Sequence, residues 1–350
     1  MATAALPEDP RTRNGPTYPF GEIATGEPVP IAPGVTLIRL ALPGPLRHVN
    51  CYLLDDDDGV ALVDTGMNTP ETRDAWKAIF RGPLAGTRIT RVVGTHFHPD
   101  HIGLAGWMCD HHRAPLLMTR AEWLTACMVR ADARPEVPPE MIARWIALGW
   151  PEEAIAAGRA RGWEGFQRIV TRMPLSYTRL RDGDRLRVGA TAWRIVVGSG
   201  HSPEHACLLD ERGGVLLAGD QVLPRISPNV SLGITEPEAD PLGEWFGSIA
   251  KLRLLDPELL VLPGHGDPFT GLYPRLVAMD AEHRERLDAL QAHLAEPRRT
   301  VDCFAVLFSR PIGLDMIGMA SGEALAHLRR LEVEGRARRE MRDDVWWWRA

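Results

Sequence analysis

Short apolar segments separated by polar turns dominate the first third of the chain. Residues 35–42 alternate apolar and polar positions, and an Asp-Asp-Asp-Asp-Gly sequence at 55–59 separates two apolar segments, as in a hairpin. Residues 69–80 instead repeat apolar positions with the period of an amphipathic helix. Strands are expected at 35–42, 50–54, 60–63, 92–94 and 116–118.

A helical segment rich in tryptophan then interrupts the strands, from about 120 to 172. Pro151 followed by two glutamates is typical of a helix start. The tryptophans of this segment are Trp123, Trp145, Trp150 and Trp163. We interpret the segment as a helical insert that forms a partial lid or wall over a functional site. Strands resume at 184–188, 193–197, 208–209, 215–217 and 259–262, and a long helix is expected at 272–294.

A different pattern follows Pro297, with three helices and then two short strands. Ser321 is expected to cap the last of these helices, and Gly335 to end it. A turn at Asp343-Asp344 separates the strands, so the pattern predicts a small winged helix. The chain is therefore expected to divide into an N-terminal extension (1–27), a main domain (28–296) and a C-terminal domain (297–350).

Composition narrows the class of protein without identifying it. The 350 residues are 45% hydrophobic and 25% charged, as in an ordinary globular protein, and the net charge of −6 does not favour a polyanionic partner. The five cysteines form no Cys-x-x-Cys pair, so neither a disulfide framework nor a thiolate zinc site is expected. The segment up to Glu27 lacks a secretory signal, and no apolar run has the length of a membrane span. We expect a cytoplasmic protein without a membrane partner.

Residues 96–101 read His-Phe-His-Pro-Asp-His and carry the densest chemistry in the chain. Four side chains that can bind a metal lie within six positions, shortly after the apolar residues Val92 and Val93. Neutral imidazole and carboxylate oxygen suit zinc, iron or manganese, whereas such a group would make a poor core. The run therefore predicts a divalent-metal site at the end of a buried strand.

The same local pattern occurs five times: an apolar strand, a turn containing glycine, and a histidine or aspartate. Glycine allows the sharp turn and the close approach of the backbone to a site, and loops at strand ends often carry functional groups. The polar residues at these five positions are Asp64, His96, His201, Asp220 and His265.

These five motifs, in this order across about 50–265, resemble those of the metallo-β-lactamase superfamily. The resemblance implies an α/β protein of the α+β type, an αββα sandwich with a dinuclear metal centre at one edge of its two sheets. It further implies that His96, His98 and His201 hold one metal, that Asp100, His101 and His265 hold the other, and that Asp220 bridges them. Asp64 is expected to orient ligands and fix its loop.

The charges of such a centre indicate a hydrolase. Two divalent ions, most simply Zn²⁺ with iron or manganese as alternatives, would leave a net positive site after Asp100, Asp220 and a bridging hydroxide are counted. That site can polarise a carbonyl or phosphoryl oxygen, and metal binding lowers the pKa of water to roughly 7. Asp100 is expected to act catalytically by orienting the hydroxide. The expected substrate is a small acyl compound: a thioester, an ester or a lactone.

Other polar residues receive weaker assignments. His205 lies four positions after His201, and because the ligand set is already complete we expect it to be structural or to orient a ligand. We expect ordinary surface positions for His111, His112, His283, His293 and His327. Residues near the motif loops that could line a substrate pocket are Arg47, His48, Tyr177, Arg225 and Asn229.

Three alternative functions stay open. The predicted winged helix resembles the tail of lactamase-β-like endoribonucleases and so allows a single-strand endoribonuclease or phosphodiesterase. A mononuclear-iron sulfur dioxygenase shares the HxHxDH run, and a non-catalytic binding protein could retain a vestigial site.

Asp220 disfavours a true β-lactamase, since those enzymes usually lack this residue. The Gly-His-Ser-Pro-Glu-His stretch at 200–205 resembles hydroxyacylglutathione hydrolases, but their C-terminal glutathione-binding region is not recognisable.

The C-terminal domain carries little excess positive charge. Residues 298–350 contain ten arginines against eight acidic residues, a net charge of +2, whereas a nucleic-acid-binding module usually shows a clear basic face. We therefore expect this domain to pack on the main domain, to form one wall of the pocket, or to mediate a homodimer. The run Trp346-Trp347-Trp348 is interpreted as an interface or docking surface.

Overall fold

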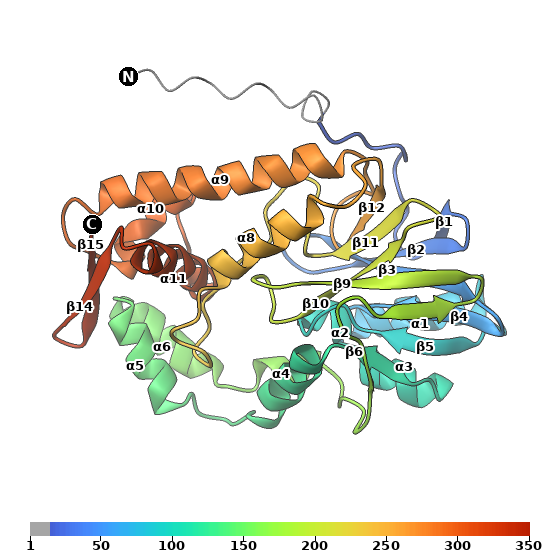
Figure 1. Cartoon of the computed structure of the whole chain (residues 1–350). Coiled ribbons are helices and arrows are strands. Elements are labelled where there is room, and N and C mark those ends of the chain that lie inside the picture. Colours follow the sequence, from blue (N-terminus) through green and yellow to red (C-terminus); the bar gives the residue numbers. More distant parts are fainter. Residues whose placement is uncertain (1–14) are drawn as a thin grey trace, which may run out of the picture.

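The structure is a computed structural model of the chain and describes residues 15–350. Two β-sheets lie face to face and helices cover the outer face of each, which gives four layers (Figure 1). This is the αββα sandwich expected from the sequence. Among the described residues, no helix combines the length and hydrophobicity that crossing a bilayer requires.

The first sheet has seven strands in the order of the sequence. Its strands are β1 (Pro28–Ala32), β2 (Val35–Ala41), β3 (His48–Asp56), β4 (Gly59–Val63), β5 (Ile89–Val93), β6 (Leu116–Met118) and β7 (Thr178–Arg179). Strands β1 to β4 are antiparallel, and β4 to β7 are parallel. The expected hairpin is present, with Asp56 opposite Gly59 across its turn. Because β4 and β5 run in parallel, their carboxyl ends reach the same edge of the sheet.

The second sheet has five strands in the order β12-β11-β10-β9-β8. The strands are β8 (Arg185–Val188), β9 (Thr191–Gly198), β10 (His205–Asp210), β11 (Val215–Gly219) and β12 (Leu260–Pro263). The connection between the parallel strands β11 and β12 contains the helix α8 (Pro241–Leu252). Asp240 begins this helix by accepting the Gly243 N–H at 3.0 Å.

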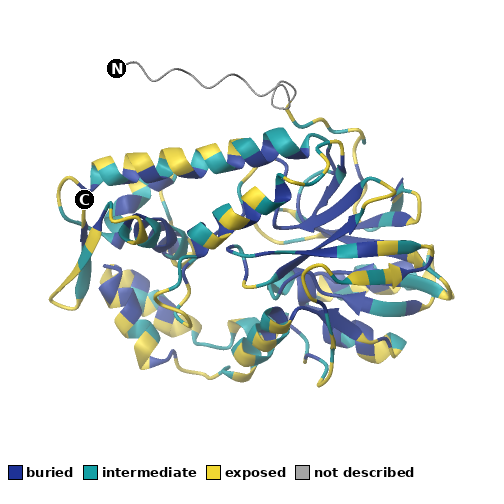
Figure 2. Ribbon diagram, in the orientation of Figure 1, coloured by how far each residue is buried: buried dark blue, intermediate teal, exposed yellow. Residues whose placement is uncertain are grey.

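Alternating side chains bury both faces of the central strands. In β2, Leu37 points between the two sheets, while Ile38 packs under the helices of the first sheet. Those helices are α1 (Pro70–Arg81), α2 (Pro99–Ile102) and α3 (Ala105–His112). The second sheet is covered by α8 and α9 (Leu272–His293). Figure 2 shows the resulting buried strands between amphipathic helices. The strands β11 and β12, which pair in parallel and are buried on both faces, read as apolar runs in the sequence.

The insert consists of helices that reach from the sandwich to the C-terminal region. They are α4 (Arg120–Ala131), α5 (Pro139–Ala147), α6 (Glu152–Arg161) and α7 (Gly165–Ile169). Trp145 and Trp150 are buried with stacked rings 4.9 Å apart, and Trp150 Nε1 donates to Ser321 Oγ at 2.8 Å. Trp123 stacks on Tyr177. The tryptophans therefore serve helical packing, and it is α4 that meets the loops of the candidate site.

The C-terminal region builds a small third sheet of order β13-β15-β14. Its elements are β13 (Arg298–Arg299), the 3-10 helix η2 (Thr300–Cys303), α10 (Phe304–Leu307), α11 (Ile317–Val333), β14 (Arg338–Arg342) and β15 (Val345–Arg349). Asp343 and Asp344 both have positive φ, 48° and 62°, as a tight hairpin turn requires. In Figure 1, α11 lies beside α8 and α9. The region thus packs on the helical layer of the second sheet.

Two sequence-based assignments in this region are wrong. Ser321 does not cap α11, which begins one turn earlier at Ile317; its hydroxyl is buried and holds Trp150 instead. Of the tryptophan run expected as an interface or docking surface, Trp348 cannot take part, since it is fully buried and donates to Thr300 Oγ1 at 3.2 Å; Trp346 and Trp347 are half-buried. Helical spacing alone could not show that these positions face another element.

His283 and His327, expected at helix surfaces, are both fully buried between α9 and α11. Their rings stack, and His283 Nδ1 lies 3.0 Å from His327 Nε2. His327 Nδ1 donates to the Glu323 carbonyl at 2.8 Å, so His327 Nε2 has no proton and accepts from His283 Nδ1. The other nitrogen of His283, Nε2, then accepts from Ser227 Oγ at 2.6 Å. Burial is tolerated because every ring nitrogen has a partner.

Candidate metal centre

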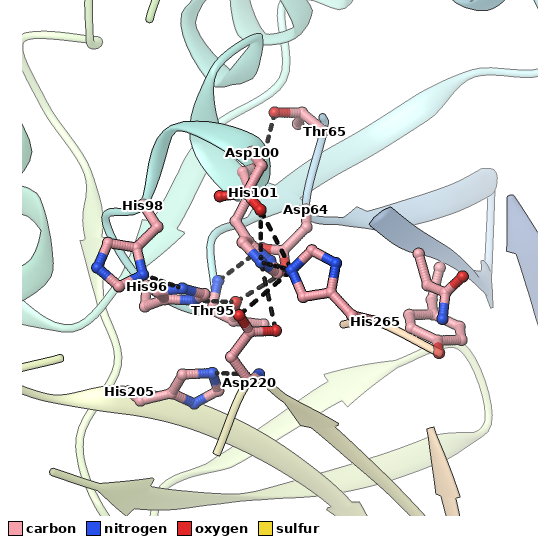
Figure 3. A network of polar contacts seen from close by, with 12 residues as sticks. Asp64, Thr65, Thr95, His96, His98, Asp100, His101, His205, Asp220 and His265 are labelled. Carbon is pink, nitrogen blue, oxygen red and sulfur yellow. Dashed lines mark hydrogen bonds and ion pairs between the residues drawn. The ribbon is translucent and has the colours of Figure 1, made fainter. Parts of the chain in front are cut away.

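The residues that follow five strands meet at one edge of the sandwich. Asp64 follows β4, the 96–101 run follows β5 and enters α2, and His201 follows β9. Asp220 and His265 follow the parallel strands β11 and β12. Figure 3 shows side chains from four of these segments pointing toward one another: His96, His98, Asp100 and His101 from the 96–101 run, with Asp64, Asp220 and His265. The structure therefore brings together all seven residues expected as metal ligands, in overlapping groups that could each hold an ion.

The first group consists of three imidazoles. His98 Nδ1 lies 2.9 Å from His96 Nε2 and 3.0 Å from His201 Nε2, and the last two nitrogens are 3.3 Å apart. Nitrogens bound at zinc distances in a tetrahedron are separated by roughly 3.3 Å. The three atoms are thus spaced as ligands of one ion would be.

The positions of the protons on these three imidazole rings support the same conclusion. His201 Nδ1 donates to the Asn229 carbonyl at 2.7 Å, so its Nε2 carries a bare lone pair. Thr95 Oγ1 donates to Asp64 and therefore accepts from His96 Nδ1, which leaves His96 Nε2 bare as well. His98 Nδ1 has at most one proton and cannot satisfy both lone pairs. A cation at this position would remove the repulsion.

The second group joins a carboxylate to two imidazoles. Asp100 Oδ2 lies 3.1 Å from His265 Nε2, and His101 Nε2 lies 3.4 Å from the same nitrogen. His265 Nδ1 donates to the His48 carbonyl at 2.7 Å, so its Nε2 faces the group without a proton in the neutral ring. One oxygen and two nitrogens suit a divalent ion.

Asp220 lies between the two groups. Its Oδ2 is 3.5 Å from His201 Nε2 and 3.3 Å from His265 Nε2, and its Oδ1 is 3.4 Å from His101 Nε2. Oδ1 is buried and has no hydrogen-bond partner among the described residues. A buried, unpartnered carboxylate oxygen is costly unless a cation binds it, so the residues around Asp220 fit the binding of metal.

The surroundings shift the pKa values of imidazoles in the two groups in opposite directions. Burial and His201 lower the pKa of His98 to about 3, which keeps it neutral as a ligand must be. Burial also lowers the pKa of His265, but Asp220 and Asp100 outweigh this effect and raise it to about 10. Burial raises the pKa of Asp100, and His101 and His265 outweigh it, giving about 2. The carboxylates thus attract positive charge to the second group.

Asp64 supports the site without reaching either group as a ligand. It is buried, with a left-handed φ of 59°. Its Oδ1 accepts the Thr95 N–H at 2.9 Å, and its Oδ2 accepts from Thr95 Oγ1 at 2.8 Å and from His101 Nδ1 at 2.7 Å. The last contact leaves His101 Nε2 to face the second group. His205 holds the backbone instead, since its Nε2 accepts the Asp220 N–H at 3.0 Å.

Glycine at a strand end is required by crowding in one clear case. A Cβ on Gly264 would lie 2.2 Å from Asp220 Oδ1 and 2.7 Å from His101 Cε1. No side chain fits at either distance. The strand-end glycine therefore lets the backbone of the β12 loop reach the ligands, as the sequence pattern indicated.

The five residues expected near a substrate pocket occupy different environments. Two hold ligands through their backbone carbonyls: His48 accepts from His265, and Asn229 accepts from His201. Arg47 is exposed in a left-handed turn before β3, Tyr177 stacks on Trp123, and Arg225 lies over the Tyr18 ring and 3.7 Å from Asp267.

Glu122, in the first turn of α4, is a residue that sequence reasoning missed. Its side chain is fully buried and accepts hydrogen bonds from the loops that carry the first group. Burial raises its pKa to about 7, although the hydrogen bonds from Ser202, Glu204 and Phe97 oppose that effect. A single glutamate within a helical pattern matches no motif, so no signal in the sequence marked it.

The chain is similar to known proteins over nearly its whole length. It matches the family model of the Metallo-beta-lactamase superfamily over residues 44–265, and that of the metallo-beta-lactamase-like C-terminal domain over 287–350. Probable metallo-hydrolase YqjP of Bacillus subtilis (strain 168) is 26% identical over 314 residues, covering 86% of this chain and 92% of that protein.

Two solved structures share the architecture. A beta-lactamase domain protein from Burkholderia ambifaria has a TM-score of 0.87 and 37% identity, over 95% of this chain and 97% of that one. Metallo-beta-lactamase family protein TTHA1429 from Thermus thermophilus has a TM-score of 0.77 and 31% identity, over 91% of this chain and 98% of that one.

Proposed function

Since the chain belongs to the metallo-beta-lactamase superfamily, we propose that it is a metal-dependent hydrolase that uses two metal ions to cleave a small acyl substrate. His96, His98 and His201 would hold the first ion, and Asp100, His101 and His265 the second. Asp220 would bridge them. Zinc suits this donor set, and iron or manganese would also be accepted.

The position of Asp220 is the observation that carries the proposal. Its Oδ2 lies within 3.5 Å of a histidine nitrogen in each group, and its Oδ1 is buried without a hydrogen-bond partner within residues 15–350. A carboxylate that served only the second group would not need to approach His201. A bridging role would give both of its oxygens a partner and would offset the cost of burying them.

The ions, when bound, would lower the pKa of water and polarise the oxygen of the scissile group. The residues of the chain supply orientation. Asp100, whose pKa is held at about 2, stays ionised at neutral pH and can accept a hydrogen bond from the attacking water. Asn229 and His48 fix the rings of His201 and His265 through their backbone carbonyls, so the ligands are already arranged before substrate binds.

The C-terminal region supports a small substrate over a nucleic acid. Six of its ten arginines, Arg299, Arg329, Arg330, Arg336, Arg339 and Arg342, form ion pairs with carboxylates. Arginines neutralised in this way do not make the basic face that phosphate backbones require. Among acyl compounds, a thioester, an ester and a lactone are the candidates.

A substrate panel tests the proposal. Purified protein reconstituted with zinc would be offered acyl-CoA, acyl-glutathione, lactone, β-lactam and bis-p-nitrophenyl phosphate substrates. We expect turnover of at least one acyl compound, lost on replacing His98 or Asp220 by alanine. Turnover of the phosphodiester alone would replace the acyl proposal with a phosphodiesterase, and one tightly bound iron per chain would contradict the hydrolase.

A further inference from the structure

Glu122 is a fully buried acidic residue that no role in binding the ions explains. Its Oε2 accepts the Phe97 N–H at 2.8 Å. Its Oε1 accepts from Ser202 Oγ and from the Glu204 N–H, both at 2.7 Å. One carboxylate therefore receives three hydrogen bonds from two loops that lie about a hundred residues apart in the chain.

Both loops carry ligands of the first group. Phe97 is the residue between His96 and His98, and Ser202 directly follows His201. The contacts between the rings of these histidines bring lone pairs together, so they do not hold the loops in place by themselves. Besides Glu122, the Ala206 N–H joins the two segments by donating to the Thr95 carbonyl at 2.8 Å, on the strand side of the ligands.

We propose that Glu122 is a positioning residue that sets the spacing of the three histidines of the first metal site. It acts through Phe97 and Ser202 and contacts neither an ion nor substrate. The proposal rests on the metal-binding part of the proposed function and is independent of which bond is cleaved. It also gives the insert a role, since α4 then holds the metal loops together from outside the sandwich.

A reciprocal set of contacts fixes the position of Glu122. Thr119 Oγ1 donates to the Glu204 carbonyl at 2.7 Å, and the Ala121 N–H donates to Glu204 Oε2 at 2.9 Å. The Glu204 side chain thus accepts a hydrogen bond from a backbone N–H in the first turn of α4, which has no partner within the helix. In return, the Glu122 side chain accepts from the backbone N–H of Glu204. The helix and the His201 loop are joined in both directions, so displacement of one moves the other.

The chemistry of the position calls for a carboxylate. Three donors converge on it, and a carboxyl group can accept on both of its oxygens, most fully when it is ionised. Glutamine would keep one accepting oxygen but turn an NH₂ group toward at least one donor. Alanine would leave all three donors without their partner in a buried place, which is costly. Alanine at position 122 should therefore disturb the two loops more than glutamine does.

Zinc affinity of the full chain tests this role without reference to activity. The protein would be stripped by a chelator and titrated with Zn²⁺ against a chromophoric competitor that resolves two binding steps. We expect Glu122→Ala to weaken one step by about 10–100-fold, the usual effect of losing a group that orients ligands, and Glu122→Gln to weaken it less. Glu140→Gln, an exposed position of the same insert, is the matched control and should change neither step.

Backgrounds with one intact group assign the effect to a site. In a His265→Ala protein, which retains the first group, Glu122→Ala should still lower zinc affinity; in a His98→Ala protein it should have little effect. Ser202→Ala, which removes only one of the three donors, serves if Glu122→Ala does not fold. Unchanged affinity in folded variants, or equal weakening of both steps, would overturn the proposal. Absence of hydrolytic activity would not, since it bears only on the proposed reaction.

Discussion

The Oδ2 atom of Asp64 accepts a hydrogen bond from His101 Nδ1 at 2.7 Å, and this contact determines which nitrogen of His101 faces the second metal group. Both side chains are buried, so water does not compete for the bond. Asp64 itself has a left-handed backbone. Its position is therefore set by the turn after β4, and the orientation of a ligand depends on the geometry of that turn.

Replacing Asp64 by asparagine should weaken zinc binding to the second group. Asparagine tolerates the left-handed backbone, but its NH₂ group must face either His101 Nδ1 or a donor of Thr95. We expect a loss of about 10–100-fold in zinc affinity, as for other residues that orient ligands. Competitive titration would measure it, with the exposed Asp58→Asn as control. Affinity equal to wild type would show that the His101 contact is dispensable.

A Gly264→Ala substitution should displace Asp220 from its proposed position between the two metal ions. The added Cβ would lie 2.2 Å from Asp220 Oδ1, so the carboxylate or the β12 loop must shift. We expect the zinc content of purified protein to fall from about two per chain to about one or fewer. Gly247→Ala on α8, where a Cβ would meet nothing within 4 Å, should retain the wild-type content. Full zinc content in Gly264→Ala would mean that the loop adapts without loss.

The buried pair His283 and His327 should make the folded protein sensitive to acid. Burial lowers the pKa of His327 to about 4. Burial and the neighbouring His327 ring lower the pKa of His283 to about 2. A histidine with a lowered pKa in the folded state contributes its full stability above the unfolded pKa of about 6.5, and loses it as pH falls toward 4. Stability should therefore decline through this window.

The contribution of His327 can be isolated by His327→Gln, which does not titrate but can still accept from His283. Between pH 7.5 and pH 5, the wild type should lose about 2 kcal/mol more unfolding free energy than this variant. Urea denaturation of chelator-treated protein would measure the difference, and the exposed His111→Gln should behave as wild type. Parallel pH dependence in wild type and His327→Gln would show that the ring titrates normally in the folded state.

Ser321→Ala should loosen the contact between the insert and the C-terminal region. It leaves the buried Trp150 Nε1 without its acceptor, at a cost of about 1–3 kcal/mol in unfolding free energy. The exposed Ser309→Ala provides the control, and urea denaturation the measurement. No change in stability would indicate that Trp150 finds another acceptor and that this bond does not join the two regions.

Elements with a strong local pattern could be predicted from the sequence. The hairpin around residues 55–59, the long helix α9 and the turn at Asp343–Asp344 all follow from apolar periodicity or turn chemistry, and the structure confirms them. The grouping of the metal-site residues was predictable for a related reason. Each motif follows a strand, and their order resembles that of the family, which implied the grouping; in the structure, the parallel pairs β4 with β5 and β11 with β12 bring these strand ends to one edge.

Contacts between elements distant in sequence were not predictable in the same way. His283 and His327 look like surface positions because helical spacing describes one helix, whereas their burial depends on the packing of α9 against α11. Ser321 looks like a cap because its role is set by Trp150, 171 positions away. Glu122 carries no pattern at all, since its three donors come from two other loops.

The claim that a two-metal centre performs acyl hydrolysis is tested most directly by titrating metal-free protein with zinc while following hydrolysis of the best acyl substrate from the panel. We predict that zinc binds to about two equivalents per chain and that full activity requires the second equivalent. Full activity at one equivalent, or two bound equivalents with no acyl hydrolysis at any ratio, would contradict the account.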